Sequence, residues 1–241
     1  MKDQKNHRWN TKEYEKRTNE LYRTDLYKLY PSESWALYRI LPRCKSILDL
    51  GCGNGAMASI SKKISSLSKY HGVDHQSKLI EDAKRKFKYA TFESSDLIYF
   101  LNKNKKKYDC VMSWSVIKSF KNWRKLISLM CDSAKKYVVC DIRVANVESE
   151  FFDENICWAE YQGRRGPIVV VNYNTFKKSI ERLKRKFERV EFVAYQSEWG
   201  KFVNFKKNFK PDTFLLTCVL HKKKTEKKIE IFERLPDNLE R

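Results

Sequence analysis

The feature that most constrains the fold is a short apolar strand that runs directly into a glycine-rich turn. Residues 46–50 read Ser-Ile-Leu-Asp-Leu, residues 51–55 read Gly-Cys-Gly-Asn-Gly, and residues 56–67 have helical character. Glycine is needed where the chain turns sharply and where its backbone must approach a ligand more closely than a Cβ atom permits. The order strand, glycine turn, helix predicts the first unit of a doubly wound α/β sheet.

The chain continues this alternation for about another 90 residues. Short apolar runs alternate with amphipathic segments, which is typical of successive βαβ units with a parallel sheet. We expect strands at 46–50, 70–73, 90–94, 108–113 and 137–141, and helices at 56–67, 76–87, 97–101 and 123–134. Right-handed crossovers would place these helices on both faces of the sheet.

The second half of the chain departs from this rhythm. Residues 142–172 have no clean period and contain a turn-prone Gly-Arg-Arg-Gly-Pro run, so we interpret them as an insertion after the fifth strand. A helix is expected at 175–186, followed by β-rich runs at 187–195 and 213–221. Because only residues 196–212 join these two runs, we expect them to pair antiparallel. Residues 229–235 fit either a short helix or a strand.

The predicted fold class is therefore α/β, a Rossmann-like doubly wound sheet of five parallel strands plus a terminal antiparallel strand pair. Apolar residues at helical intervals predict N-terminal helices within residues 1–43, which would form an appendage or lid. Residues 44–221 would form the Rossmann-like domain, with 142–172 as a lid over the substrate. Residues 222–241, which begin with a charge run, would be a basic C-terminal tail.

Cysteine use and hydropathy exclude several classes of protein. The seven cysteines are scattered without a C-x-x-C pair, so neither a disulfide framework nor a zinc or other metal site is expected. No segment approaches the roughly 20 apolar residues of a membrane-spanning helix. The first 14 residues are charged and lack the apolar stretch of a signal peptide. We therefore expect a cytoplasmic protein.

The charge balance is strongly basic. Fifty Lys and Arg residues stand against 30 Asp and Glu residues, a formal net charge of +20. A balance of this size attracts polyanions such as RNA. Lysine is spread along the whole chain, however, and such use of lysine can equally reflect codon bias. The charge alone leaves both interpretations open.

Two acids follow the second and third predicted strands. Asp74 closes the second strand, where its carboxylate can accept hydrogen bonds from both hydroxyls of a ribose. Asp96 follows the third strand, where it can accept a hydrogen bond from an adenine amino group. Together with the glycine turn, these acids indicate a site for an adenosine-containing cofactor.

In order and spacing, four segments resemble the motifs of class I S-adenosylmethionine-dependent methyltransferases. They are Asp-Leu-Gly-Cys-Gly-Asn-Gly at 49–55, Gly-Val-Asp at 72–74, Ser-Asp-Leu at 95–97 and Tyr-Asp-Cys-Val-Met-Ser at 108–113. The resemblance is strong over residues 41–141 and looser as far as residue 221. It implies that the cofactor is S-adenosyl-L-methionine and that the protein is a methyltransferase.

The resemblance also implies a role for each motif. Asp49 and the glycine loop would contact the amino-acid end of the cofactor, and Asp74 the ribose. Asp96 and Leu97 would contact the adenine, with His75 against its ring, while Ser113 and Trp114 would form the floor near the methyl group. The expected cofactor-binding residues are thus Asp49, Gly51, Cys52, Gly53, Gly55, Asp74, His75, Asp96, Leu97 and Ser113.

A nicotinamide-dependent enzyme is the obvious competitor, because it uses the same fold and a similarly placed ribose acid. The loop is G-x-G-x-G rather than G-x-G-x-x-G, and Asp49 precedes the first glycine by two positions. A carboxylate there would lie near the diphosphate of a dinucleotide, and it suits an α-amino group better. A phosphate-binding Walker loop is excluded because no G-K-[ST] follows the glycines.

Methyl transfer from a sulfonium needs an aligned nucleophile and the exclusion of water more than it needs a catalytic dyad. A base is required only where the acceptor is protonated at neutral pH. No catalytic residue can be assigned from the sequence. The candidates are Glu160 and Tyr161 in the insertion, and Asp141 with Arg143 at the end of the fifth strand, where open α/β sheets place their ligands.

The insertion and the N-terminal helices set our expectation for the acceptor. The insertion is aromatic and basic, and its Arg164-Arg165 pair fits either recognition of a carboxylate or phosphate or a solvated turn. The chain has no N/D-P-P-Y/F run and no Pro-Cys pair, which disfavours methylation of exocyclic amino groups and of pyrimidine carbon. We expect transfer to oxygen or nitrogen of a small-molecule, sugar or lipid-linked acceptor. The alternatives are an RNA methyltransferase and a non-catalytic S-adenosylmethionine-binding protein.

Overall fold

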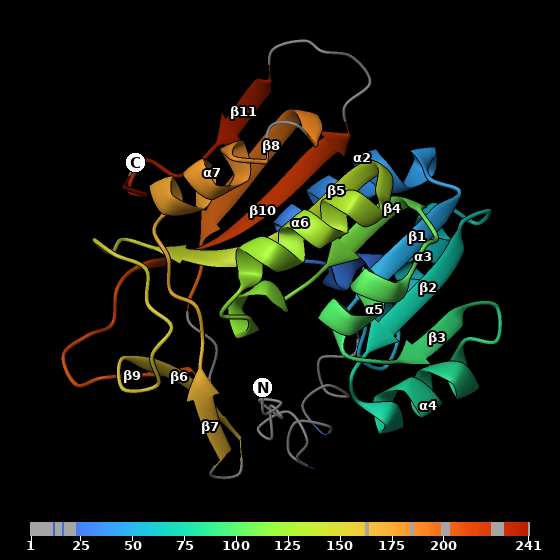
Figure 1. The fold of residues 1–241 in the computed structure, drawn as a ribbon, viewed down its shortest axis with the longest axis horizontal. Coiled ribbons are helices and arrows are strands. Elements are labelled where there is room, and N and C mark those ends of the chain that lie inside the picture. The colour runs from blue at the N-terminus through green and yellow to red at the C-terminus, as the bar shows by residue number, and fades with distance from the viewer. Residues whose placement is uncertain are drawn as a thin grey trace.

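The computed structural model shows an α/β fold with a second, smaller sheet at one edge (Figure 1). The structure describes Lys12, Lys16 and residues 23–161, 164–183, 186–198, 203–222 and 229–240, apart from the side chains of Tyr161 and Arg164. Most of the predicted N-terminal helical region before residue 23 therefore lies outside the described residues.

The large sheet has eight strands in the order β11-β8-β10-β5-β4-β1-β2-β3. Five of them run parallel to one another, as predicted: β1 Ser46–Leu50, β2 Lys69–Asp74, β3 Thr91–Ser94, β4 Tyr108–Ser113 and β5 Ala134–Ala145. The chain starts at the centre with β1, moves outward to β3, and then crosses to β4 and β5. The strand order therefore reverses between β1 and β4, where doubly wound sheets bind their ligands.

Strand β5 is longer than predicted. The sequence places its end at Asp141, whereas the strand continues to Ala145. Its pairing with β4 ends at Cys140, but its pairing with β10 continues to Ala145 and keeps the chain extended. Asp141 and Arg143 interrupt the apolar run, which made this part of the strand look like the start of the insertion.

The predicted antiparallel pair is confirmed. β8 Phe187–Gln196 and β10 Thr213–Lys222 pair antiparallel, and β10 also pairs antiparallel with β5. β10 thus lies between two strands, β5 and β8, that precede it in the chain. Beyond β8 the sheet gains β11, Glu230–Arg234, which runs parallel to β8. All five residues of β11 are exposed, so the sequence showed no alternation that would distinguish a strand from a helix.

Helices cover both faces of the large sheet. One face carries α2 Pro31–Ile40, α3 Ala56–Ile64 and α4 Ser77–Lys86, which share one buried cluster with the sheet. The other face carries α5 Leu97–Lys103, α6 Trp123–Ser133 and α7 Tyr173–Glu181, which share a second cluster. The part of the chain that the structure describes also contains three short 3-10 helices: η2 Leu26–Lys28, η3 Leu41–Arg43 and η4 Ile117–Ser119. The crossovers therefore produce the three layers expected of the fold.

The insertion and the β8–β10 connection build the small sheet together. Its strands are β7 Arg164–Pro167, β6 Cys157–Tyr161 and β9 Val203–Phe205, in that order and antiparallel. β9 lies in the segment that the sequence indicated only as a loop. In Figure 1 this sheet lies at the lower left, near the end of β5 and the start of β10. Its own small core contains Cys157, Ala159, Ile168 and Val170.

All seven cysteines are buried and none forms a disulfide, in line with the scattered spacing. Among the helices that the structure describes, none is both long enough and apolar enough to cross a membrane.

Substitution of Trp123, the first residue of α6, tests how much the packing of this helix against the sheet contributes to stability. Trp123 is fully buried, its ring stacks on that of Phe176 at 5.3 Å between centroids, and its Nε1 donates to Glu150 Oε1 at 2.8 Å. We expect Trp123→Ala to lower the free energy of unfolding by about 3–5 kcal/mol, measured by urea denaturation, because it leaves a large cavity. Leu67→Ala, at an 87% exposed position, is the control and should change it by less than about 0.5 kcal/mol. Equal midpoints for the two variants would contradict this assignment of the core.

Candidate functional site

The glycine loop follows β1 at the carboxyl edge of the parallel strands. Gly51, Gly53 and Gly55 all have positive φ, at 77°, 54° and 82°. A Cβ atom on Gly51 would lie 2.3 Å from Val116 Cγ2, and one on Gly55 would lie 2.9 Å from Phe92 Cε1. Other residue types are therefore excluded at Gly51 and Gly55 by conformation and by space.

Asp74, at the end of β2, joins the glycine loop to the second strand. Its Oδ2 accepts a hydrogen bond from the Gly53 backbone at 3.0 Å, and its Oδ1 accepts one from the Gln76 backbone at 2.9 Å. His75 lies beside it, with Nδ1 3.3 Å from Asp74 Oδ1. The carboxylate is buried, yet its two oxygens have more lone pairs than these two backbone donors use. Asp74 thus orders the loop and keeps capacity to accept hydrogen bonds from a ligand.

Asp49 lies in β1 just before the loop and is 2% exposed. Its pKa is raised to about 7, mainly by burial; the hydrogen bond donated by the Tyr70 hydroxyl opposes the rise, and the charge of Asp74 adds to it. Two buried acids close together make a site that favours a cation. Tyr70 was missed in the sequence analysis; it shares one face of β2 with Gly72 and Asp74, an alternation that could have indicated it.

The other predicted cofactor residues occupy structural positions around the loop. Asp96 is exposed, and its Oδ1 caps α5 by accepting from the Tyr99 backbone at 2.8 Å. Leu97 is buried in the core. Cys52, a residue of the loop itself, is buried, and its Sγ would lie 2.7 Å from a Cβ on Gly72. The fully buried Ser113 donates its hydroxyl to the Leu50 carbonyl at 3.0 Å, so it supports the loop from below.

A pocket lies at the same edge, beyond β4. Its lining residues are Ser115, Lys118, Asp141, Ile142, Arg143 and Leu215. Asp141 Oδ1 accepts a hydrogen bond from the backbone of Ser115, which has a φ of 59°. Burial raises the pKa of Asp141 to about 6, although that hydrogen bond and nearby Lys118 oppose the rise. We refer to these six residues as the β5 pocket.

The β5 pocket and the glycine loop are neighbours. Val116 follows Ser115 directly, and it is the residue whose Cγ2 occupies the space that a side chain on Gly51 would need. The structure therefore brings Asp141 to the edge where Asp49 and Asp74 lie.

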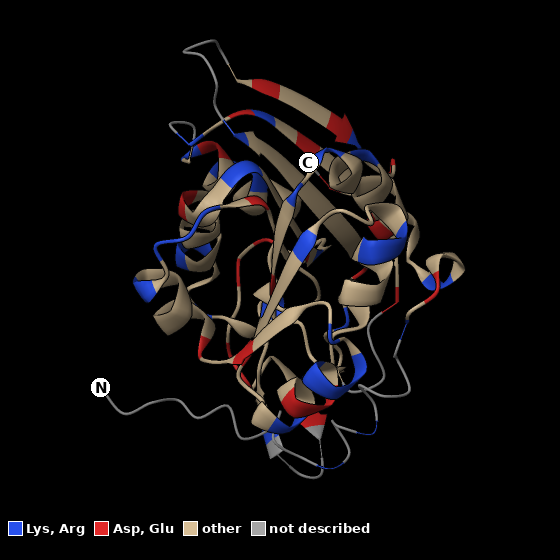
Figure 2. Cartoon of the chain, turned by 90° about the vertical axis from the view of Figure 1, so that its right-hand side faces the viewer, with Lys and Arg blue, Asp and Glu red and all other residues tan. Residues whose placement is uncertain are grey.

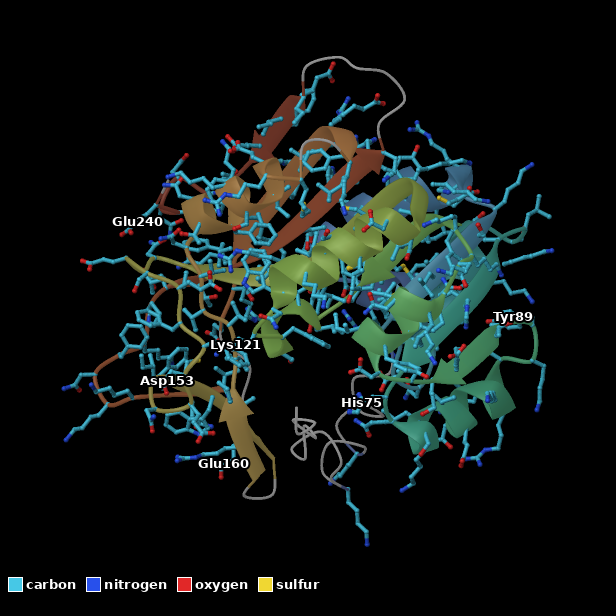
Figure 3. All side chains as sticks on the ribbon, in the orientation of Figure 1. His75, Tyr89, Lys121, Asp153, Glu160 and Glu240 are labelled. Atoms are coloured by element: carbon cyan, nitrogen blue, oxygen red, sulfur yellow. The ribbon has the colours of Figure 1, made fainter. Side chains whose placement is uncertain are left out.

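Glu160 is placed differently. It lies on β6 of the small sheet, and its Oε2 accepts from Trp158 Nε1 at 3.2 Å. Figure 3 shows Glu160 on the small sheet, to the left of His75, which lies beside α4. The backbone of Tyr161 also belongs to β6, but its side chain lies outside the described residues, as do the Arg164 side chain and Gly163. Arg165 lies over the Trp158 ring at 5.6 Å.

Several solved structures resemble this fold at low identity. The N-terminal domain of EvdMO1 with SAH bound has a TM-score of 0.59 and 10% identity, covering 86% of this chain and 84% of that one. The plantazolicin methyltransferase BamL, in complex with a triazolic desmethylPZN analog and SAH, has a TM-score of 0.55 and 15% identity, covering 87% and 88%. The O-methyltransferase from a trans-AT PKS multienzyme of Brevibacillus brevis, in complex with S-adenosyl-L-homocysteine, has a TM-score of 0.55 and 11% identity, covering 77% and 70%.

The family is shown by the sequence itself. No curated protein sequence matches the chain. A family model described as a methyltransferase domain matches residues 22–210, which include the glycine loop, all five parallel strands and the β5 pocket except Leu215. The chain therefore belongs to the methyltransferase domain family, which confirms the resemblance to class I S-adenosylmethionine-dependent methyltransferases.

Proposed function

We propose that this methyltransferase transfers the methyl group of S-adenosylmethionine to an oxygen or nitrogen atom of a small-molecule acceptor. The observation that carries the proposal is a loop of three left-handed glycines held between two buried acids, Asp49 and Asp74. Support for a small acceptor comes from fold neighbours whose names describe an O-methyltransferase of a polyketide multienzyme and a plantazolicin methyltransferase.

The residues present fit this cofactor. The Asp49 carboxylate would face the α-amino group, and the carboxylate of Asp74 would accept from the ribose hydroxyls. The side-chain amide nitrogen of Gln76 is buried beside Asp74 and has no hydrogen-bond partner among the described residues, as expected at a polar binding site. The full proposed set is Asp49, Gly51, Cys52, Gly53, Gly55, Asp74, His75, Asp96, Leu97 and Ser113.

The chemistry needs little from the protein beyond placement. When bound, S-adenosylmethionine supplies an electrophilic methyl group on a sulfonium. The protein's residues position the acceptor in line with that methyl group and exclude water. Of the three candidate bases, Asp141 lines the pocket beside the loop, and its pKa of about 6 leaves it ionised above pH 7. It would take the proton of a hydroxyl or ammonium acceptor and free the lone pair for attack.

Calorimetric titration tests the cofactor assignment. S-adenosylmethionine and S-adenosylhomocysteine should bind, and NAD should not. Asp74→Ala should weaken both by about 10- to 100-fold, because hydrogen bonds to a charged group are lost and the loop loses its tie to β2. Glu81→Gln, an exposed change on α4, is the control and should bind normally. Preferred binding of NAD, or unchanged affinity in the Asp74 variant, would contradict the assignment.

The raised pKa of Asp49 predicts that cofactor affinity depends on pH. In the free protein Asp49 holds a proton below pH 7, whereas the bound α-ammonium favours the carboxylate, so binding releases a proton. Affinity for S-adenosylhomocysteine should therefore rise between pH 5.5 and about 7, by up to roughly tenfold per unit.

Two variants check the source of this dependence. Asp49→Asn should abolish it, because the amide does not titrate. Tyr70→Phe should move its midpoint to higher pH, because the hydrogen bond that stabilises the carboxylate is lost. A pH profile that Asp49→Asn leaves unchanged would assign the titration to another group.

RNA is the alternative acceptor, favoured by the net charge of +20. Figure 2 shows lysines and arginines spread over helices, strands and loops and interleaved with acids, which favours the small acceptor. We expect affinity for a single-stranded RNA oligonucleotide to fall steeply from 50 to 200 mM salt, by fluorescence anisotropy, without incorporation of labelled methyl. Methyl incorporation into the RNA at 200 mM salt would reverse this preference.

A further inference from the structure

The face of the large sheet that packs against α2 changes character toward the carboxyl end of β5. Tyr137 and Val139 pack with the apolar cluster on this face, and the next two positions on the same face are Asp141 and Arg143. Asp141 lies opposite Thr217 of β10, and residues directly opposite share a face. The change from apolar to charged side chains occurs just where β5 extends past β4.

Arg143 is half-buried in the β5 pocket and has few partners of its own. Its Nη1 donates to Ser197 Oγ at 2.9 Å, and this is one of five N–H donors on a guanidinium. Burial lowers the pKa of Arg143, but nearby Asp141 opposes that shift. The Arg143 guanidinium therefore lines the pocket, and the described residues use only one of its N–H donors.

The hydrogen bonds accepted by Asp141 and by Glu33, an acid near Asp141, come from donors other than Arg143. Asp141 accepts the backbone N–H of Ser115. Glu33, buried at the start of α2, accepts two hydrogen bonds from Arg23, both at 2.8 Å, and a third from the Tyr30 backbone at 2.9 Å. Glu33 is therefore paired with Arg23 and does not hold the Arg143 guanidinium.

The other lining residues complete a site for a small acid. Lys118 supplies a second positive charge, and Leu215, which is 6% exposed and lies opposite both Arg143 and Tyr195, supplies an apolar wall. The Thr217 hydroxyl, on the same face, is fully buried and has no hydrogen-bond partner among the residues that the structure describes. An unpaired buried hydroxyl is rare and indicates a place where a polar ligand or water belongs.

We propose that the β5 pocket binds a carboxylate group of the methyl acceptor, with Arg143 as its bidentate partner and Lys118 as a second cation. The inference rests on the proposed function and narrows the acceptor to small carboxylic acids. Arginine matches the planar geometry of a carboxylate. The contact between Val116 and Gly51 keeps the anchored acceptor next to the loop that holds the methyl donor.

Ligand-observed NMR titration, with saturating S-adenosylhomocysteine, tests this proposal. Benzoate is the probe, and benzamide is its neutral counterpart of the same shape. We expect benzoate to bind at least about tenfold more tightly than benzamide, and Arg143→Met to weaken benzoate by at least about tenfold, since the charge-assisted pair is lost. Arg143→Lys and Lys118→Met should have smaller effects.

The matched control is Lys121→Met, an exposed lysine that follows η4 and is labelled in Figure 3, which should bind benzoate as the parent does. Equal binding of benzoate and benzamide, stronger binding of inorganic phosphate than of benzoate, or no effect of Arg143→Met would overturn the carboxylate site. Calorimetry with S-adenosylhomocysteine on the same variants separates the two proposals. If the cofactor product binds normally and benzoate binds no more tightly than benzamide, only the carboxylate site is rejected. If the parent protein does not bind S-adenosylhomocysteine, the proposed function is rejected.

Discussion

The close approach of the glycine loop to its neighbours is the constraint on which the rest of the site depends. Gly51 lies against Val116 and Gly55 against Phe92 at distances that a Cβ atom would make impossible. The loop can therefore lie at once against the chain that follows β4 and against β3. This compact arrangement places the acids of β1 and β2 beside the pocket at the end of β5, so the proposed cofactor site and the proposed acceptor site share one edge.

Burial of negative charge is the second feature of this edge. Asp49, Asp74 and Asp141 are all buried in a chain whose net charge is +20. Buried acids are costly to ionise, and burial raises the pKa of both Asp49 and Asp141. Their position where doubly wound sheets bind ligands supports the proposed roles of these acids in cofactor binding and proton transfer.

The sequence predicts the parts of the fold that follow local patterns. The five parallel strands, the glycine loop and the antiparallel pair of β8 and β10 can be read from periodicity and spacing. Asp74 and Asp141 can be placed because each ends a predicted strand. The extension of β5 past Asp141 could not be predicted, because its charged residues imitate a strand end. β9 pairs with a strand more than 40 residues away, and no local pattern encodes such pairing. The hydrogen bond that the Tyr70 hydroxyl donates to Asp49 depends on a tertiary contact. The capping role of Asp96 is local to the start of α5.

The position of β10 has a consequence for the folding of the chain. β10 lies between β5 and β8, although it follows both in the chain. Until residues 213–222 pair with them, β5 and β8 each have an unpaired edge on the side that β10 later occupies. Such edges can pair incorrectly with other strands. During synthesis the two strands can be joined in the sheet only after residues 213–222 have left the ribosome. Leu215 belongs to β10 and lies opposite Arg143, so the apolar wall of the β5 pocket forms only when β10 pairs with β5.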